Sequence, residues 1–175
     1  MPSVSGLNRE QRGRARDRVV QAALLALDNK DAMDYTDPTV QARIALRWDG
    51  IQNRRNSWRQ EFPIHSDCSS FATWCLWNAL FLHFHLDDFV NDKDWTWGTT
   101  FTMLENGRRV EHPRSHACRG DVVLYDAGGG FSSAHCAVIV AREDGNLKAV
   151  SHGGDAGPFY VDFDYRPVRE VRRYI

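Results

Sequence analysis

Residues 66–80 read SDCSSFATWCLWNAL, a polar turn followed directly by a strongly apolar run. Ser66 and Asp67 both belong to the residue types that cap helices. They predict a helix over residues 68–86. The first backbone N–H groups of a helix lack intrahelical partners, and the helix dipole is positive at that end. Both effects stabilise a thiolate, so Cys68 is a candidate nucleophile, with a small buried core residue as the alternative.

The residue pattern changes after Gly120, where short apolar and β-branched runs are mostly separated by glycine-containing turns. Such runs predict strands. They cover residues 121–126, 134–141, 147–152, 158–163 and 168–175. Upstream, an apolar stripe behind the potential cap Asn8 predicts a helix over residues 8–28. A second helix is predicted over residues 37–48.

Helices first and consecutive strands afterwards are typical of an α+β fold. A chain of 175 residues is expected to form one domain. We expect a helical N-terminal part over residues 1–61 and a catalytic core over residues 62–175. In this arrangement the N-terminal helices pack on an antiparallel sheet of about five strands.

The composition excludes several classes of protein. The chain is 42% hydrophobic and 11% aromatic and has a net charge of -1, which excludes a disordered chain and a generally basic nucleic-acid coat. No apolar stretch approaches the ~20 residues that a membrane span needs, so no stable membrane association is expected. Four cysteines are too few for a disulfide scaffold. Arginines clustered in residues 9–18 are interpreted as a solvated face, with contact to an anionic surface or nucleic acid as the alternative.

Two histidines on the predicted strands are candidate partners for Cys68. His135 begins one strand, and His152 ends the next, across the turn at residues 144–146. The start of one strand and the end of the next lie opposite each other in an antiparallel hairpin. One imidazole could therefore accept the Cys68 proton while the other orients it.

Four segments, in this order, resemble the NlpC/P60 cysteine peptidases of the papain-like superfamily: DCSSF (67–71), GDVV (120–123), AHCAVI (134–139) and VSH (150–152). The resemblance spans about residues 62–155, and the tail over residues 151–174 is similar to the peptidase domains of actinobacteriophage endolysins. It implies a papain-like fold and hydrolysis of bacterial peptidoglycan peptides, typically at the D-glutamyl–diaminopimelate bond.

The same resemblance implies roles for single residues. Cys68 would be the nucleophile, His135 the base and His152 the residue that orients the base, with Asp155 as the alternative third member. The family's Tyr-x-Trp-Gly-Gly stretch, whose tyrosine helps to form the oxyanion site, is replaced here by NRRNSWRQEFPIHS. His65 and Trp58 are the candidate substitutes for that tyrosine.

Polar neighbours of the nucleophile and two loop tryptophans are the candidate substrate contacts: Asp67, Ser69, Ser70, Trp95 and Trp97. Core packing is the alternative for the tryptophans. Zinc is the main chemical rival, but no Cys-x-x-Cys or His-Glu-x-x-His pattern occurs, so neither a metal nor another cofactor is expected. Cys75 and Cys136 are expected in the core, Cys136 because it points to the sheet face opposite His135.

The resulting hypothesis is a monomeric cysteine endopeptidase, the catalytic domain of a phage endolysin, whose partner is the peptide part of peptidoglycan and not nucleic acid. Residues 1–18 lack the apolar core and cleavage site of a signal peptide. We therefore expect the protein in the host cytoplasm until lysis and then at the cell wall. The alternatives are another papain-like amidase or acyltransferase, an N-acetylmuramoyl-L-alanine amidase, or a non-catalytic module that binds the wall or a partner.

Overall fold

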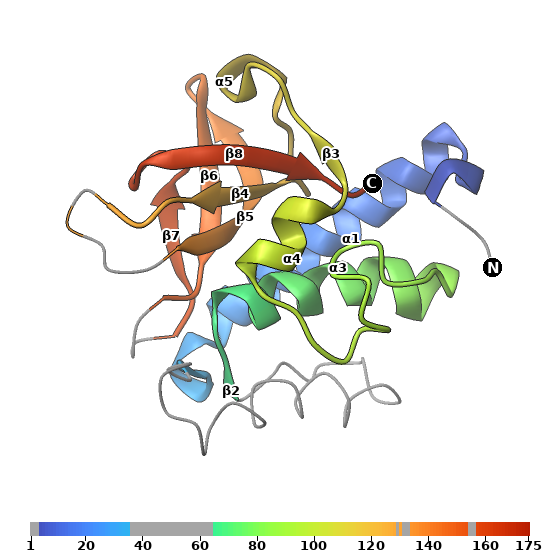
Figure 1. Ribbon diagram of the computed structural model, residues 1–175. Helices are drawn as coiled ribbons and strands as arrows, with labels where there is room; N and C mark the ends of the chain where they lie inside the picture. The colour runs from blue at the N-terminus through green and yellow to red at the C-terminus, as the bar shows by residue number, and fades with distance from the viewer. Residues whose placement is uncertain (1–3, 36–64, 129, 131–133, 154–156) are drawn as a thin grey trace.

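The computed structural model describes residues 4–35, 65–128, 130, 134–153 and 157–175. These residues form an α+β fold with a six-stranded antiparallel sheet and two long helices (Figure 1). The strand order in the sheet is β3-β8-β4-β5-β6-β7. The strands are β3 (Arg108–Arg109), β4 (Val122–Tyr125), β5 (His135–Glu143), β6 (Asn146–Ser151), β7 (Phe159–Asp162) and β8 (Val168–Arg173). The predicted fold class is confirmed, and all five predicted strands occur; the short strand β3 adds a sixth.

The two long helices begin at capping boxes. In α1 (Arg9–Asp28), the side chain of Asn8 accepts a hydrogen bond from the backbone N–H of Gln11, as its position before the apolar stripe predicts. In α3 (Cys68–Phe84), Asp67 is the N-cap, so the predicted helix start is confirmed. The helix predicted over residues 37–48 lies outside the described residues.

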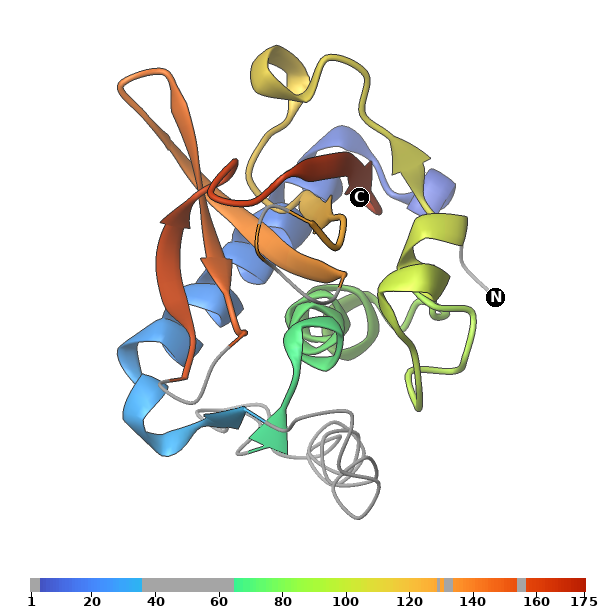
Figure 2. The ribbon, with the colours of Figure 1, turned by 60° about the vertical axis from the view of Figure 1, so that its left-hand side comes forward.

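Both long helices lie on one side of the sheet, as Figure 1 and Figure 2 show. They contact each other and the central strand β5. Alternate residues of β5 face them, with Cys136 and Val138 in the core between sheet and helices. Ala137 and Ile139 belong to a second core on the other face of the sheet. Because side chains alternate along a strand, His135 shares the face of Ala137.

The remaining elements are short. They are the 3₁₀ turns η1 (Val4–Gly6) and η2 (Lys30–Ala32), the helices α4 (Thr100–Glu105) and α5 (Pro113–His116), and the strands β1 (Asp34–Tyr35) and β2 (His65–Ser66). Strand β1 pairs in parallel with β2, which sets Tyr35 beside Ser66 at the entry to α3. Within the described part of the chain, no helix is long and apolar enough to cross a membrane.

Candidate active site

Cys68 occupies the first position of α3, and its polar neighbours build the start of this helix. Asp67 Oδ1 accepts hydrogen bonds from the Ser70 backbone N–H at 2.8 Å and from the Ser69 hydroxyl at 2.9 Å. The Asp67 backbone N–H donates to Ser70 Oγ at 2.9 Å. All three are buried. These three predicted substrate contacts thus hold the helix start in place, because their polar atoms are hydrogen-bonded to one another.

His135 reaches the Cys68 sulfur from the beginning of β5. The two side chains interact electrostatically, and the imidazole, only 3% exposed, stacks on Tyr125 with ring centroids 5.9 Å apart. The adjacent Cys136 thiol, followed by the charge of His135, lowers the pKa of Cys68 to about 5, although burial and the Asp67 carboxylate oppose this. At neutral pH the sulfur is therefore a thiolate.

The far nitrogen of the His135 ring meets a hydroxyl rather than a second imidazole. His135 Nε2 lies 2.6 Å from Ser151 Oγ, and Ser151 Oγ lies 3.0 Å from the Tyr165 hydroxyl. We call His135, Ser151 and Tyr165 the hydroxyl relay. Since Nε2 is engaged with Ser151, Nδ1 is the nitrogen left for Cys68. Neither hydroxyl is predicted from the sequence.

A β-bulge explains why Ser151 stands where His152 was expected. Near the turn, β5 and β6 pair as Ala141 with Lys148. If this register continued, Ala137 would pair with His152, and His152 would share the face of His135. The register instead shifts between Ile139 and Ala141, so Ala137 pairs with Ser151. A shift of one residue moves every later side chain to the opposite face of the sheet. His152 therefore does not face His135, and its predicted orientation is wrong.

His152 lies on the helix side of the sheet and supports the junction before α3. Its Nδ1 is 2.8 Å from Ser66 Oγ. Its ring packs edge to face against two aromatic rings, with centroid distances of 5.5 Å to Tyr35 and 5.9 Å to Phe71. Burial lowers the pKa of His152 to about 4, so the ring is neutral at pH 7. Its alternative Asp155 lies outside the described residues.

Gly153 leaves room for the His135 ring. A Cβ atom at this position would lie 2.6 Å from Cε1 and 3.0 Å from Nε2 of His135, closer than side chains approach one another. Any larger residue would push the imidazole away from Ser151 or from Cys68. The glycine after the predicted strand is therefore a steric requirement of the site, which the sequence pattern did not indicate.

The other predicted candidates lie elsewhere or outside the described residues. Trp95 is 1% exposed and donates its indole N–H to the Leu86 carbonyl oxygen, so it belongs to the core rather than to a groove rim. Trp97 is 43% exposed. His65 lies in β2, directly before the helix junction, and Trp58 falls outside the described residues.

The Gly-Asp pair at the start of β4 has a structural role. Asp121 accepts hydrogen bonds from the Arg173 guanidinium at 2.8 and 2.7 Å and from the Cys118 backbone N–H at 2.9 Å. Arg173 ends β8, so this carboxylate ties two neighbouring strands together. In the described part of the chain, no three His, Cys, Asp or Glu residues are grouped as metal ligands.

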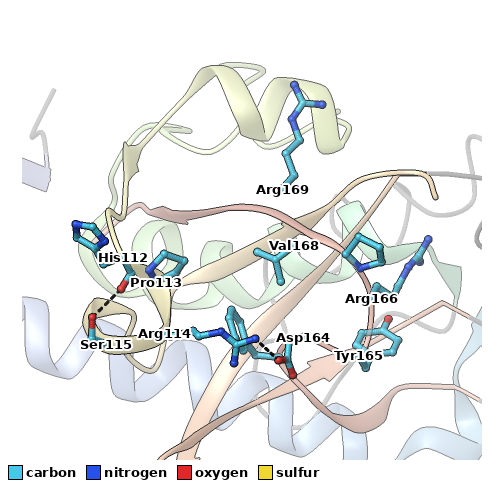
Figure 3. Close-up of a pocket in the computed structure, with 11 residues that line it drawn as sticks. His112, Pro113, Arg114, Ser115, Asp164, Tyr165, Arg166, Val168 and Arg169 are labelled. Carbon is cyan, nitrogen blue, oxygen red and sulfur yellow. Dashed lines mark hydrogen bonds and ion pairs between the residues drawn. The ribbon is translucent and has the colours of Figure 1, made fainter. Parts of the chain in front are cut away.

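A hollow of about 800 Å³ opens on the sheet face away from the two long helices (Figure 3). It lies between α5 and the chain that joins β7 to β8, and the ion pair of Arg114 and Asp164, 2.7 Å long, lines it. Tyr165 lines the same hollow. Because Tyr165 also contacts Ser151, the hollow adjoins the hydroxyl relay.

Known structures share this arrangement of helices and strands. NlpC2 from Trichomonas vaginalis matches with a TM-score of 0.52 and 18% identity, over 90% of this chain and 47% of that chain. NlpC1 from the same organism matches with a TM-score of 0.50 and 19% identity, over 89% and 44% of the two chains. The chain therefore has an NlpC/P60-like fold.

At these identities the NlpC/P60-like likeness concerns the fold, and the chain spans less than half the length of either structure. A comparison of the sequence with protein-family models gives no match, and neither does a comparison with curated proteins. These comparisons therefore show neither an activity nor a substrate for this chain.

Proposed function

We propose that the protein is a cysteine peptidase that hydrolyses amide bonds in the stem peptides of bacterial peptidoglycan. The observation that carries the proposal is the position of Cys68 at a helix start beside His135, whose charge helps to lower the pKa of the thiol. This pair supplies a nucleophile and an acid–base group in contact. The substrate class rests on the four sequence segments that resemble NlpC/P60 peptidases, and the NlpC/P60-like fold supports it.

In the first half of the reaction, the Cys68 thiolate attacks the amide carbonyl carbon. The resulting oxyanion is stabilised at the start of α3, where backbone N–H groups and the positive end of the dipole converge. Asp67 already accepts the N–H groups of Ser70 and Phe71. The N–H groups of Cys68 and Ser69 remain at the helix start, and we assign that of Cys68, the attacking residue, to the oxyanion. The C–N bond then breaks as His135 gives its proton to the leaving amine, and a thioester remains on Cys68.

In the second half, water replaces the amine. His135 accepts a proton from the water as its oxygen attacks the thioester carbonyl, and Cys68 leaves as a thiolate. Throughout, Ser151 holds the ring through Nε2, and Tyr165 holds Ser151. The proposed third member of the site is thus an uncharged hydroxyl, which orients the ring without supplying a compensating negative charge.

The finer parts of the proposal are the D-glutamyl–diaminopimelate bond and the role of a phage endolysin. The experiment digests purified peptidoglycan with the protein and identifies the new ends by mass spectrometry. A new amino end on diaminopimelate with a new carboxyl end on D-glutamate is expected. Cys68→Ala should abolish these products, whereas the control Cys75→Ala, a buried cysteine on the same helix, should retain them.

Other outcomes would overturn specific parts of the proposal. New ends between muramic acid and L-alanine would identify an amidase instead of an endopeptidase. Undiminished digestion by Cys68→Ala would rule out the cysteine mechanism. A folded protein that releases no new ends from any peptidoglycan type would overturn the substrate class.

A further inference from the structure

A second cysteine touches the candidate nucleophile. Cys136 follows His135 on β5 and points to the helix side of the sheet, where its thiol donates to the Cys68 carbonyl oxygen at 3.2 Å. Cys136 is also the largest influence that lowers the pKa of the Cys68 thiol, and Cys68 in turn raises that of Cys136, so the two side chains lie side by side. The peptidase mechanism uses Cys68 and His135 but assigns no step to Cys136.

The two sulfurs differ in access and in protonation. Cys68 is 7% exposed at the helix start, while Cys136 is fully buried behind it. Burial and the adjacent Cys68 raise the pKa of the Cys136 thiol well above its ordinary value. Cys68 is therefore the sulfur that a small electrophile reaches as a thiolate, and Cys136 is the sulfur that Cys68 reaches.

We propose that Cys68 and Cys136 form a peroxide-responsive dithiol site, in which Cys136 captures oxidised Cys68 as a reversible disulfide. In the first step the Cys68 thiolate attacks a hydroperoxide oxygen. An S–O bond forms, the O–O bond breaks, and the departing oxygen takes up a proton as water or an alcohol. The sulfur loses two electrons to the peroxide and becomes a sulfenic acid.

In the second step the Cys136 sulfur attacks the sulfur of the Cys68 sulfenic acid. An S–S bond forms and the S–O bond breaks, and hydroxide leaves with the Cys136 proton as water. The Cys136 sulfur already contacts Cys68, so this capture is intramolecular, which favours it over further oxidation by peroxide. The disulfide blocks the nucleophile, and an external dithiol restores both thiols by exchange.

The other cysteines offer matched controls. Cys75 is buried on α3, seven residues after Cys68, and burial raises the pKa of its thiol. Cys118 is partly exposed, and the Arg173 guanidinium donates to its sulfur at 3.2 Å. In the described residues, no hydrogen bond joins the sulfur of Cys75 or Cys118 to Cys68. We therefore expect neither cysteine in the disulfide.

The experiment treats the wild-type protein, Cys136→Ala and Cys118→Ser with one equivalent of hydrogen peroxide and maps the peptides without reduction. Chymotryptic cleavage after Phe71 or Trp74 separates Cys68 from Cys75. The wild type and Cys118→Ser should give a peptide linked through Cys68 and Cys136, which dithiothreitol removes. In Cys136→Ala, Cys68 should proceed to sulfinic and sulfonic acids.

The experiment measures the masses of peptides, so its result does not depend on peptidase activity. It therefore tests this inference separately from the proposed function. Irreversible oxidation of Cys68 in the wild type, at the rate seen in Cys136→Ala, would overturn the inference. A disulfide from Cys68 to Cys75 or Cys118 would overturn it as well. If Cys136→Ala fails to fold, which circular dichroism would show, the wild-type peptide map alone decides between these outcomes.

Discussion

Ser151 Oγ lies 2.6 Å from His135 Nε2, so a hydroxyl holds the imidazole that faces Cys68. His152, the next residue along the chain, points to the other face of the sheet and bonds Ser66. Two adjacent residues therefore hold the two sides of the site. One positions the base, and the other supports the entry to the helix that carries the nucleophile.

This arrangement leads to a ranking of variants. Ser151→Ala should lower kcat by about 10²-fold, the lower end of the contribution of a group that supports acid–base catalysis, because the ring loses its orienting partner. Ser151→Thr should restore most of the rate because it keeps the hydroxyl. His152→Gln should affect thermal stability more than kcat. A larger loss of kcat in His152→Gln than in Ser151→Ala, with both proteins folded, would contradict the ranking.

The space for the imidazole can be tested at Gly153. Gly153→Ala places a Cβ where the His135 ring now lies, with a contact of 2.6 Å to Cε1. We expect a loss of activity with little change in circular dichroism, since the ring has to move away from Ser151 or Cys68. Gly13→Ala is the matched control, because nothing lies within 4 Å of its added Cβ and alanine favours the helix. Equal activity of the two variants would show that the ring does not need this space.

His152 predicts a pH dependence of stability. Burial lowers its pKa from 6.5 to about 4, so between these values the unfolded chain binds a proton that the folded chain does not. Its contribution to stability is therefore complete above pH 6.5 and is lost as the pH falls toward 4, up to about 3 kcal/mol.

Urea unfolding of the wild type and of His152→Gln at several pH values measures this contribution. The difference in the pH slopes of the two proteins, rather than their absolute stabilities, isolates the titration of the ring. Parallel slopes would show that His152 is not buried as a neutral imidazole.

The local signals in the sequence were strong enough to predict much of this fold. Asn8 and Asp67 stand before apolar helical runs, and caps of this kind act through neighbouring backbone groups only. The turn after Glu143 and the strands around it were also predicted, because a glycine-containing turn and apolar, β-branched runs specify them locally.

The third member of the site could not be predicted because it depends on the register of two strands. Up to Ala141 the pairing follows from the turn, and the bulge beyond it exchanges His152 for Ser151. The position of a bulge cannot be predicted within a run such as AVIVA, because every residue of the run is compatible with a regular strand. The role of Tyr165 was missed for a similar reason, since it reaches Ser151 from a connection distant in sequence.

Alkylation by iodoacetamide, followed as a rate against pH, measures whether the fold makes Cys68 a thiolate at neutral pH. Peptide mapping assigns the label to each cysteine. We expect Cys68 to react first, with an inflection of its rate near pH 5, and we expect His135→Ala and Cys136→Ala both to move this inflection upward. An inflection of the wild type near pH 9, the value of an unperturbed thiol, would contradict this expectation.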